Sequence, residues 1–174
     1  MNGLIHIYCG DGKGKTTASM GLAVRAAGCG MKVVLTQFMK GDSSGELNVL
    51  KKLDNVKLVF CEKNFGFVWN MTEQEKAEAK AGYSKQFDEA VKLAIDTNAD
   101  MLVMDEFMSC FELGFIDNEK ALDFLRNKPE HLEVVLTGRN PSQELIDIAD
   151  YVSEIKKIKH PFDKGVNARR GIEA

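Results

Sequence analysis

The segment LIHIYCGDGKGKTT, residues 4–17, decides the fold. Its first part, Leu4–Tyr8, is a short apolar run typical of a buried strand, and helical periodicity begins at Lys15. Three glycines lie between these two elements, at positions 10, 12 and 14. Glycines let backbone N–H groups turn inward around phosphate oxygens, and the following helix adds its positive N-terminal end. The order of strand, glycine-rich loop and helix therefore predicts a phosphate-binding loop.

The residues predicted to bind a nucleotide form one continuous run, Gly10, Asp11, Gly12, Lys13, Gly14, Lys15, Thr16 and Thr17. In the pattern GxxxxGK[ST], the lysine places a compact positive charge against the phosphates, and the hydroxyl that follows reaches a bound Mg²⁺. The match is incomplete because Cys9 stands where the pattern has its first glycine. The alternative is a glycine-rich turn with incidental lysines, which the flanking strand and helix disfavour.

A second acidic motif supports the loop. The apolar run Met101–Met104 ends at Asp105 and Glu106, as in a Walker B strand. A carboxylate there lies at the carboxyl edge of a parallel sheet, where it can hold Mg²⁺ or its waters. We therefore predict a metal site from Thr16 with Asp105 or Glu106. The spacing does not choose between these two acids, or between Mg²⁺ and Mn²⁺, and many buried strands end in an acid without binding a metal.

Short apolar runs alternate with longer amphipathic segments, which predicts a parallel sheet with helices on both faces. The expected fold is α/β, a three-layer P-loop NTPase (RecA-like) fold with a mostly parallel central sheet of about six strands, in one domain over residues 1–174. Strands are expected at 4–8, 33–38, 56–60, 101–104, 132–136 and, with alternating character, 151–158. Helices are expected at 15–27, 46–53, 72–97, 118–127 and 142–149, with an irregular tail after residue 159.

Composition narrows the class of protein but not its activity. The chain has 174 residues, with 23 Lys and Arg against 26 Asp and Glu, a net charge of −3. Nucleic-acid binders are normally basic, so we expect no nucleic-acid partner. No apolar stretch approaches a membrane span, and the N-terminus lacks the features of a signal peptide. The four cysteines lie far apart, so we expect reduced thiols in a cytoplasmic protein.

The loop alone leaves several reaction classes open. One is a P-loop ATPase or switch that acts on a protein partner. Another is a small-molecule kinase, which usually carries an arginine-rich lid, whereas the five arginines of this chain form no cluster. A third is a transferase. We find no catalytic loop of the protein-kinase type and no serine or cysteine nucleophile motif.

Several segments together resemble the P-loop corrinoid adenosyltransferases, the ATP:cob(I)alamin adenosyltransferase family. The loop GDGKGKTT is similar to the loop of that family, which also lacks the leading glycine. The resemblance runs from about residue 3 to residue 173 and rests on QFMKG (37–41) with Gly45 and Glu46, GFVW (66–69), Asp105-Glu106, VVLTGRNPSQELIDIADYVSEI (134–155) and HPFDKGVNARRGIEA (160–174). The P-loop is shared by many proteins, but the ordered carboxyl-terminal segments are specific.

The resemblance implies a defined reaction, in which the Co(I) of a reduced corrinoid attacks the 5′-carbon of ATP and inorganic triphosphate leaves. Lys15 and Thr16 would then be catalytic, because they stabilise the leaving group together with the metal. Co(I) is a strong nucleophile, so positioning and electrostatics suffice without a protein base. The resemblance also implies that ATP binds in reverse relative to ordinary P-loop ATPases.

The resemblance gives Phe67 and Trp69 a role as well. They would press on the corrinoid and displace its lower axial base, leaving four-coordinate Co(II) that is easier to reduce. From the sequence alone, core packing or a lid contact is the alternative. The implied partners are ATP, a corrinoid (cobalamin, cobinamide or a precursor), an electron-donating reductase or flavoprotein, and a second copy of the chain. One departure is FMSCFELGF after Glu106, where relatives commonly carry a Thr or Asn and a Tyr.

Overall fold

The computed structural model describes residues 2–40, 44–63, 65 and 71–172. Six parallel strands form one sheet in the order β3-β2-β4-β5-β1-β6. The strands are β1 (Ile5–Cys9), β2 (Val33–Gln37), β3 (Val56–Val59), β4 (Met101–Asp105), β5 (Glu133–Thr137) and β6 (Tyr151–Glu154). The helices are α1 (Lys15–Gly28), α2 (Leu47–Leu50), α3 (Glu73–Asp96), α4 (Phe107–Glu112), α5 (Asn118–Asn127), α6 (Gln143–Ile148) and the 3₁₀ helix η2 (Pro161–Lys164). The predicted α/β fold is confirmed.

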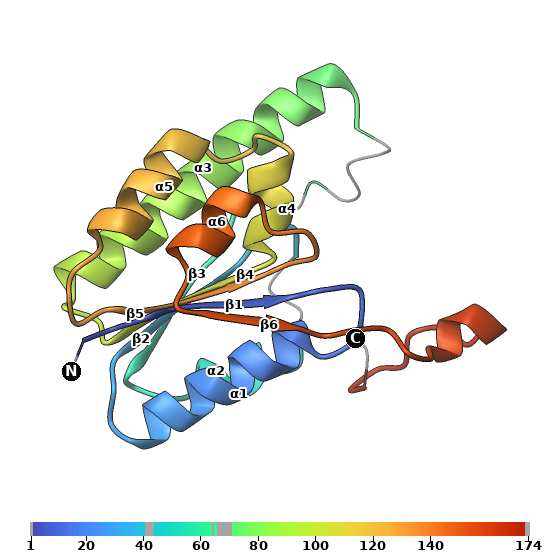
Figure 1. Cartoon of the computed structure of the whole chain (residues 1–174), viewed down its shortest axis with the longest axis horizontal. Coiled ribbons are helices and arrows are strands. Elements are labelled where there is room, and N and C mark those ends of the chain that lie inside the picture. The colour runs from blue at the N-terminus through green and yellow to red at the C-terminus, as the bar shows by residue number, and fades with distance from the viewer. Residues whose placement is uncertain (1, 41–43, 64, 66–70, 173–174) are drawn as a thin grey trace.

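Helices cover the sheet on both faces (Figure 1). α1 and α2 lie on one face, and α3, α4, α5 and α6 lie on the other. Every residue of β2 and of β4 is buried, because these central strands are covered from both sides. Two apolar clusters follow from this arrangement, one on each face of the sheet. The continuous apolar runs in the sequence therefore mark the central strands correctly.

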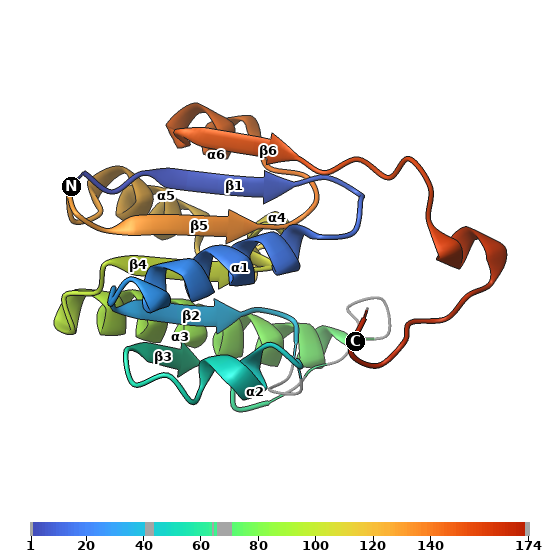
Figure 2. The ribbon, with the colours of Figure 1, turned by 90° about the horizontal axis from the view of Figure 1, so that it is seen from below.

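The strand order brings the functional segments to one edge. All six strands are parallel, so their carboxyl ends lie on the same side of the sheet (Figure 2). Ligands of open α/β sheets bind outside these ends. The loops that follow β1, β2, β4, β5 and β6 reach this edge from distant parts of the sequence.

The last strand is shorter and more exposed than predicted. It ends at Glu154 rather than near residue 158, and its four residues are all exposed instead of alternating. β6 is an edge strand with β1 as its one neighbour, so neither of its faces is fully covered. Beyond Glu154, the backbone of this segment is hydrogen-bonded to the loop that follows β1. The Gly12 N–H donates to the Ile155 carbonyl over 2.8 Å.

Helix α4 was not predicted. It begins directly after Glu106, and four of its six residues are buried. A run as apolar as FMSCF shows no clear helical periodicity, so the sequence pattern does not separate it from a buried strand or loop. No helix within residues 2–40, 44–63, 65 and 71–172 is both long enough and apolar enough to cross a bilayer.

The capping box of α3 gives a test of the fold. The Thr72 hydroxyl accepts a hydrogen bond from the Glu75 N–H, and the Glu75 carboxylate accepts one from the Thr72 N–H over 2.8 Å. We expect Thr72→Ala to lower the free energy of unfolding by about 1 kcal/mol, a fall in Tm of about 2–4 °C. Calorimetry checks this, with Gln74→Ala in the same turn as the control. An unchanged Tm for Thr72→Ala would contradict the assigned cap.

Candidate active site

The glycine-rich loop packs against the chain that leaves β6. Gly10 has a φ of +105°, and a Cβ at this position would lie 2.4 Å from the Ile155 carbonyl oxygen. A Cβ on Gly12 would lie 2.7 Å from the same oxygen. Gly14 has a φ of +125° and precedes the first residue of α1. Gly10 and Gly14 are therefore required by their backbone angles, and Gly10 and Gly12 by the close approach of Ile155, so the fold itself requires glycine at all three positions.

Lys15 and Asp11 point in different directions. The Lys15 ammonium donates to the Gly12 carbonyl over 2.9 Å and lines the cavity above the loop. Burial lowers the pKa of Lys15, against the opposing effect of the Glu106 carboxylate. The Asp11 carboxylate accepts a hydrogen bond from the Lys157 N–H over 2.9 Å, which lowers the pKa of Asp11. Lys15 is thus placed to bind a polyanion in the cavity, whereas Asp11 holds the loop against the carboxyl-terminal segment through its hydrogen bond to Lys157.

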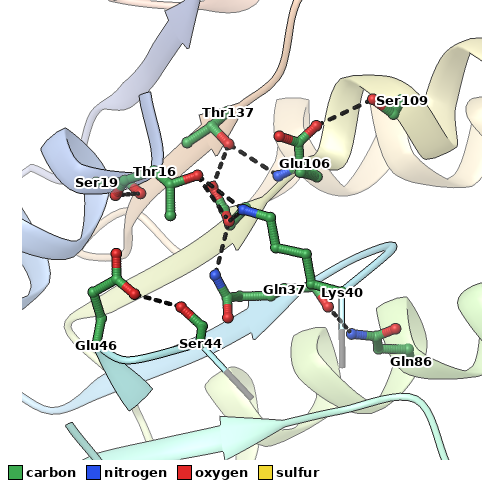
Figure 3. Close-up of polar contacts among 11 residues, drawn as sticks. Thr16, Ser19, Gln37, Lys40, Ser44, Glu46, Gln86, Glu106, Ser109 and Thr137 are labelled. Carbon is green, nitrogen blue, oxygen red and sulfur yellow. Dashed lines mark hydrogen bonds and ion pairs between the residues drawn. The ribbon is translucent and has the colours of Figure 1, made fainter. Parts of the chain in front are cut away.

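The Asp105 carboxylate is the centre of the site. It is fully buried and accepts four hydrogen bonds, whose donors Thr16, Gln37, Lys40 and Thr137 are labelled in Figure 3. Oδ2 accepts from the Thr16 hydroxyl at 3.2 Å, the Gln37 amide at 2.9 Å and the Lys40 ammonium at 3.0 Å. Oδ1 accepts from the Thr137 hydroxyl at 2.6 Å. The carboxylate therefore joins the ends of three neighbouring strands to the first turn of α1.

Glu106 has a different position from its neighbour. Its φ is +57°, in the left-handed region, and its N–H donates to the Thr137 hydroxyl over 2.9 Å. Its carboxylate lines the cavity and accepts a hydrogen bond from the Ser109 hydroxyl over 3.2 Å (Figure 3). The turn in the backbone separates the two acids. Asp105 faces Thr16 under the loop, and Glu106 faces the open cavity.

The donor set at Asp105 is compatible with a divalent metal. Mg²⁺ prefers oxygen ligands and is usually held by one or two carboxylates with substrate phosphates and waters, rather than by a cage of protein side chains. The Thr16 hydroxyl and the Asp105 carboxylate supply two such oxygens, and the Lys40 ammonium already lies against both. Among the residues that the structure describes, no group of three or more His, Cys, Asp or Glu is placed to hold a metal ion.

The cavity above the loop is large and has two kinds of wall. Its volume is about 1080 Å³. One wall, mostly polar, consists of the glycine-rich loop with Met39, Lys40, Ser44, Gly45, Glu46, Glu106 and Arg139. The other wall is the C-terminal strap, residues 155–172, which runs out beyond the strands and turns back (Figure 2). It contributes His160, Pro161, Phe162, Val166, Asn167, Ala168, Gly171 and Ile172.

Phe67 and Trp69 lie outside the described residues, but the segment before them is fixed on α3. The Phe65 ring packs edge-on against Tyr83, with ring centroids 5.5 Å apart. A Cβ on Gly82 would lie 2.9 Å from both Cys61 Sγ and the Phe65 ring. Because Gly82 has no side chain, Cys61 and Phe65 can pack closely on α3.

The structure brings together the predicted loop residues, Asp105 and Glu106, and it adds partners that the sequence analysis did not assign. Gln37, Lys40, Thr137 and Arg139 were quoted only as parts of motifs. Their positions in the sequence could have indicated them as site residues, because each lies near or just after the carboxyl end of a predicted strand. The strap was expected to be irregular from residue 160 onward, and its contribution to the cavity was not predicted.

Comparisons with known proteins identify the class. The sequence model of the family ATP:corrinoid adenosyltransferase BtuR/CobO/CobP matches residues 1–174. The chain belongs to this family and is a transferase. It is similar to the corrinoid adenosyltransferase of a Sinorhizobium species, with 36% identity over 98% of this chain and 80% of that protein. It is also similar to the corrinoid adenosyltransferase CobA of Salmonella typhimurium (36%) and to the enzyme of Escherichia coli K12 (34%), each over 98% of this chain and 85% of the relative.

Thr137 offers a test of the buried network. Its hydroxyl is donor to Asp105 and acceptor from the Glu106 N–H, so Thr137→Val leaves two polar groups without this partner. We expect a loss of about 1–3 kcal/mol in the free energy of unfolding, with weaker ATP binding because Asp105 and Glu106 lose their alignment. Denaturant titration and calorimetric ATP binding measure the two effects. Thr137→Ser keeps the hydroxyl and should remain close to wild type; equal losses in both variants would contradict the assigned role.

Proposed function

We propose that this protein transfers the 5′-deoxyadenosyl group of ATP to the cobalt of a Co(I) corrinoid and releases inorganic triphosphate, in the synthesis or salvage of adenosylated corrinoids. The observation that carries the proposal is the position of Asp105 and Thr16 directly beneath a glycine-rich loop, in a chain that matches the corrinoid adenosyltransferase family over its whole length. The resemblance found in the sequence supports the same reaction.

In this proposal, the loop and Lys15 bind the triphosphate of ATP. The inward N–H groups and the N-terminal end of α1 favour anionic oxygens, and the Lys15 ammonium adds a full charge. These groups stabilise the charge that develops on triphosphate as it leaves. The metal, Mg²⁺ or Mn²⁺, would be held by Thr16 and Asp105 and would supply further neutralisation of the triphosphate. Glu106, which faces the cavity, is then available to position the metal's waters or the substrate.

The strap and the cavity supply room for the second substrate. A volume of about 1080 Å³ lies just above the range of roughly 300–1,000 Å³ for small-molecule sites, so the cavity leaves room for a substrate beside the nucleotide. Phe162 and Ile172 are 69% and 57% exposed and line this space. A corrinoid is a large macrocycle with apolar ring faces and amide groups around its edge, and such side chains offer contact area to the ring faces. ATP in the reversed orientation would present its 5′-carbon to this side.

The resemblance also supports roles that lie outside the described residues or the single chain. Phe67 and Trp69 would press on the corrinoid and displace its lower axial base. An electron-donating reductase or flavoprotein would supply Co(I). The protein would act in the cytoplasm as a homodimer, which sedimentation analysis can test.

The reaction is tested by incubating the protein with ATP, Mg²⁺ and chemically reduced cobalamin. We expect a light-sensitive Co–C product and one equivalent of triphosphate. Lys15→Ala should reduce the rate by at least about 100-fold, because the leaving group loses its charged partner. Lys52→Ala, an exposed lysine away from the cavity, is the control. Formation of ADP without a corrinoid product would instead support a P-loop ATPase or a kinase.

The role of Trp69 is tested by changing the oxidation state of the substrate. Trp69→Ala should impair turnover that starts from Co(II) with a mild reductant, because the axial base remains bound and makes reduction harder. Turnover from pre-formed Co(I) should be affected less, whereas Lys15→Ala should impair both. Electron paramagnetic resonance of bound Co(II) reports the coordination number directly. Equal losses of Trp69→Ala in the two assays would rule out the proposed role.

A further inference from the structure

Lys40 holds a positive charge between the two oxygens assigned to the metal. Its ammonium lies 3.0 Å from Thr16 Oγ1 and 3.0 Å from Asp105 Oδ2 (Figure 3). The Asp105 side chain is fully buried, whereas 37% of the Lys40 side chain is exposed. The lysine therefore reaches in from the rim of the cavity and neutralises a carboxylate that is out of contact with water.

A divalent cation cannot bind the same oxygens while the ammonium stays in place. Mg²⁺ binds oxygen at about 2.0–2.1 Å, so a metal held by Thr16 and Asp105 would lie where the ammonium makes its contacts. The two cations would also repel each other at this separation. Metal binding therefore requires Lys40 to leave Asp105.

The displaced side chain has a destination in the same cavity. Lys40 borders this cavity together with Lys15 and the loop residues. Its flexible four-carbon stem lets the ammonium move while the backbone stays in place. Bound triphosphate is the strongest anion that it would meet there. The movement exchanges a carboxylate for phosphate oxygens, so the charge of Lys40 remains paired.

We propose that Lys40 is an internal counter-cation that occupies the metal position and yields it only when metal arrives together with a nucleoside triphosphate. The proposal rests on the function proposed above, in that it takes Thr16 and Asp105 as metal ligands. Free metal brings no anion, so a displaced Lys40 meets only single carboxylates that already line the cavity, such as those of Glu46 and Glu106. Metal with ATP supplies the triphosphate as a new partner, so metal and nucleotide bind cooperatively through this side chain. Lys40 is thus a specificity-determining residue for the metal–nucleotide complex over either component alone.

The test measures Mn²⁺ binding to the nucleotide-free protein by electron paramagnetic resonance of the unbound ion. We expect Lys40→Met to bind Mn²⁺ roughly tenfold more tightly than wild type, because the competing charge-assisted hydrogen bonds are gone. The Mn²⁺ affinity of Lys40→Ala should change in the same direction, which would show that the effect does not come from the methionine side chain itself. Lys40→Arg keeps the charge and should stay close to wild type. Lys52→Met is the matched control.

The second measurement is the effect of ATP on Mn²⁺ affinity, after correction for metal bound by free ATP. ATP should increase the affinity of wild type by a larger factor than that of Lys40→Met, because only wild type gives Lys40 a new partner. Equal Mn²⁺ affinities of wild type, Lys40→Met and Lys40→Ala without nucleotide would overturn the proposal. Asp105→Asn distinguishes an error in the metal assignment from an error in the role proposed for Lys40. If it leaves Mn²⁺ binding unchanged, the metal assignment itself is wrong; if it abolishes binding while the Lys40 variants match wild type, only the role of Lys40 is wrong.

Discussion

The structure depends on one buried carboxylate. Asp105 is out of contact with water, and an isolated charge there would be very costly. Its cost is offset by hydrogen bonds from Thr16, Gln37, Lys40 and Thr137. Thr16 lies in the first turn of α1, Gln37 and Thr137 end β2 and β5, and Lys40 lies in the segment that follows β2. The carboxylate therefore fixes the relative positions of three neighbouring strand ends and the phosphate loop, which is also the arrangement that a metal–triphosphate complex needs.

A second constraint is the contact between the glycine-rich loop and the end of β6. The Gly12 N–H and the Asp11 carboxylate are both bound to backbone groups of residues 155 and 157. These contacts fix the loop against the end of β6, and the strap that follows is directed over the cavity. One set of contacts therefore shapes the glycine-rich loop and begins the strap that forms the second wall of the cavity. The loop and the start of the strap are therefore held together by hydrogen bonds, although most of the sequence lies between them.

Local patterns in the sequence predicted most of the elements, because each pattern has a local physical cause. Thr72 and Glu75 define the start of α3 through hydrogen bonds three residues apart. The apolar run before Asp105 is a fully buried central strand. Helix α4 and the exposure of β6 were missed, since the first has a uniformly apolar sequence and the second depends on its place at the edge of the sheet.

The sequence by itself determined the class of protein, because the ordered motifs along the chain are specific to one family. It also located the glycine-rich loop and the two candidate acids, because each of these rests on residues that are close together in the chain. The tertiary structure decided what each acid contacts. Asp105 lies beneath Thr16 and Glu106 faces the cavity, and a single left-handed residue makes the difference. It also brought Lys40 to the Thr16 and Asp105 oxygens and the strap to the cavity, since such contacts arise only when parallel strands place their carboxyl ends side by side.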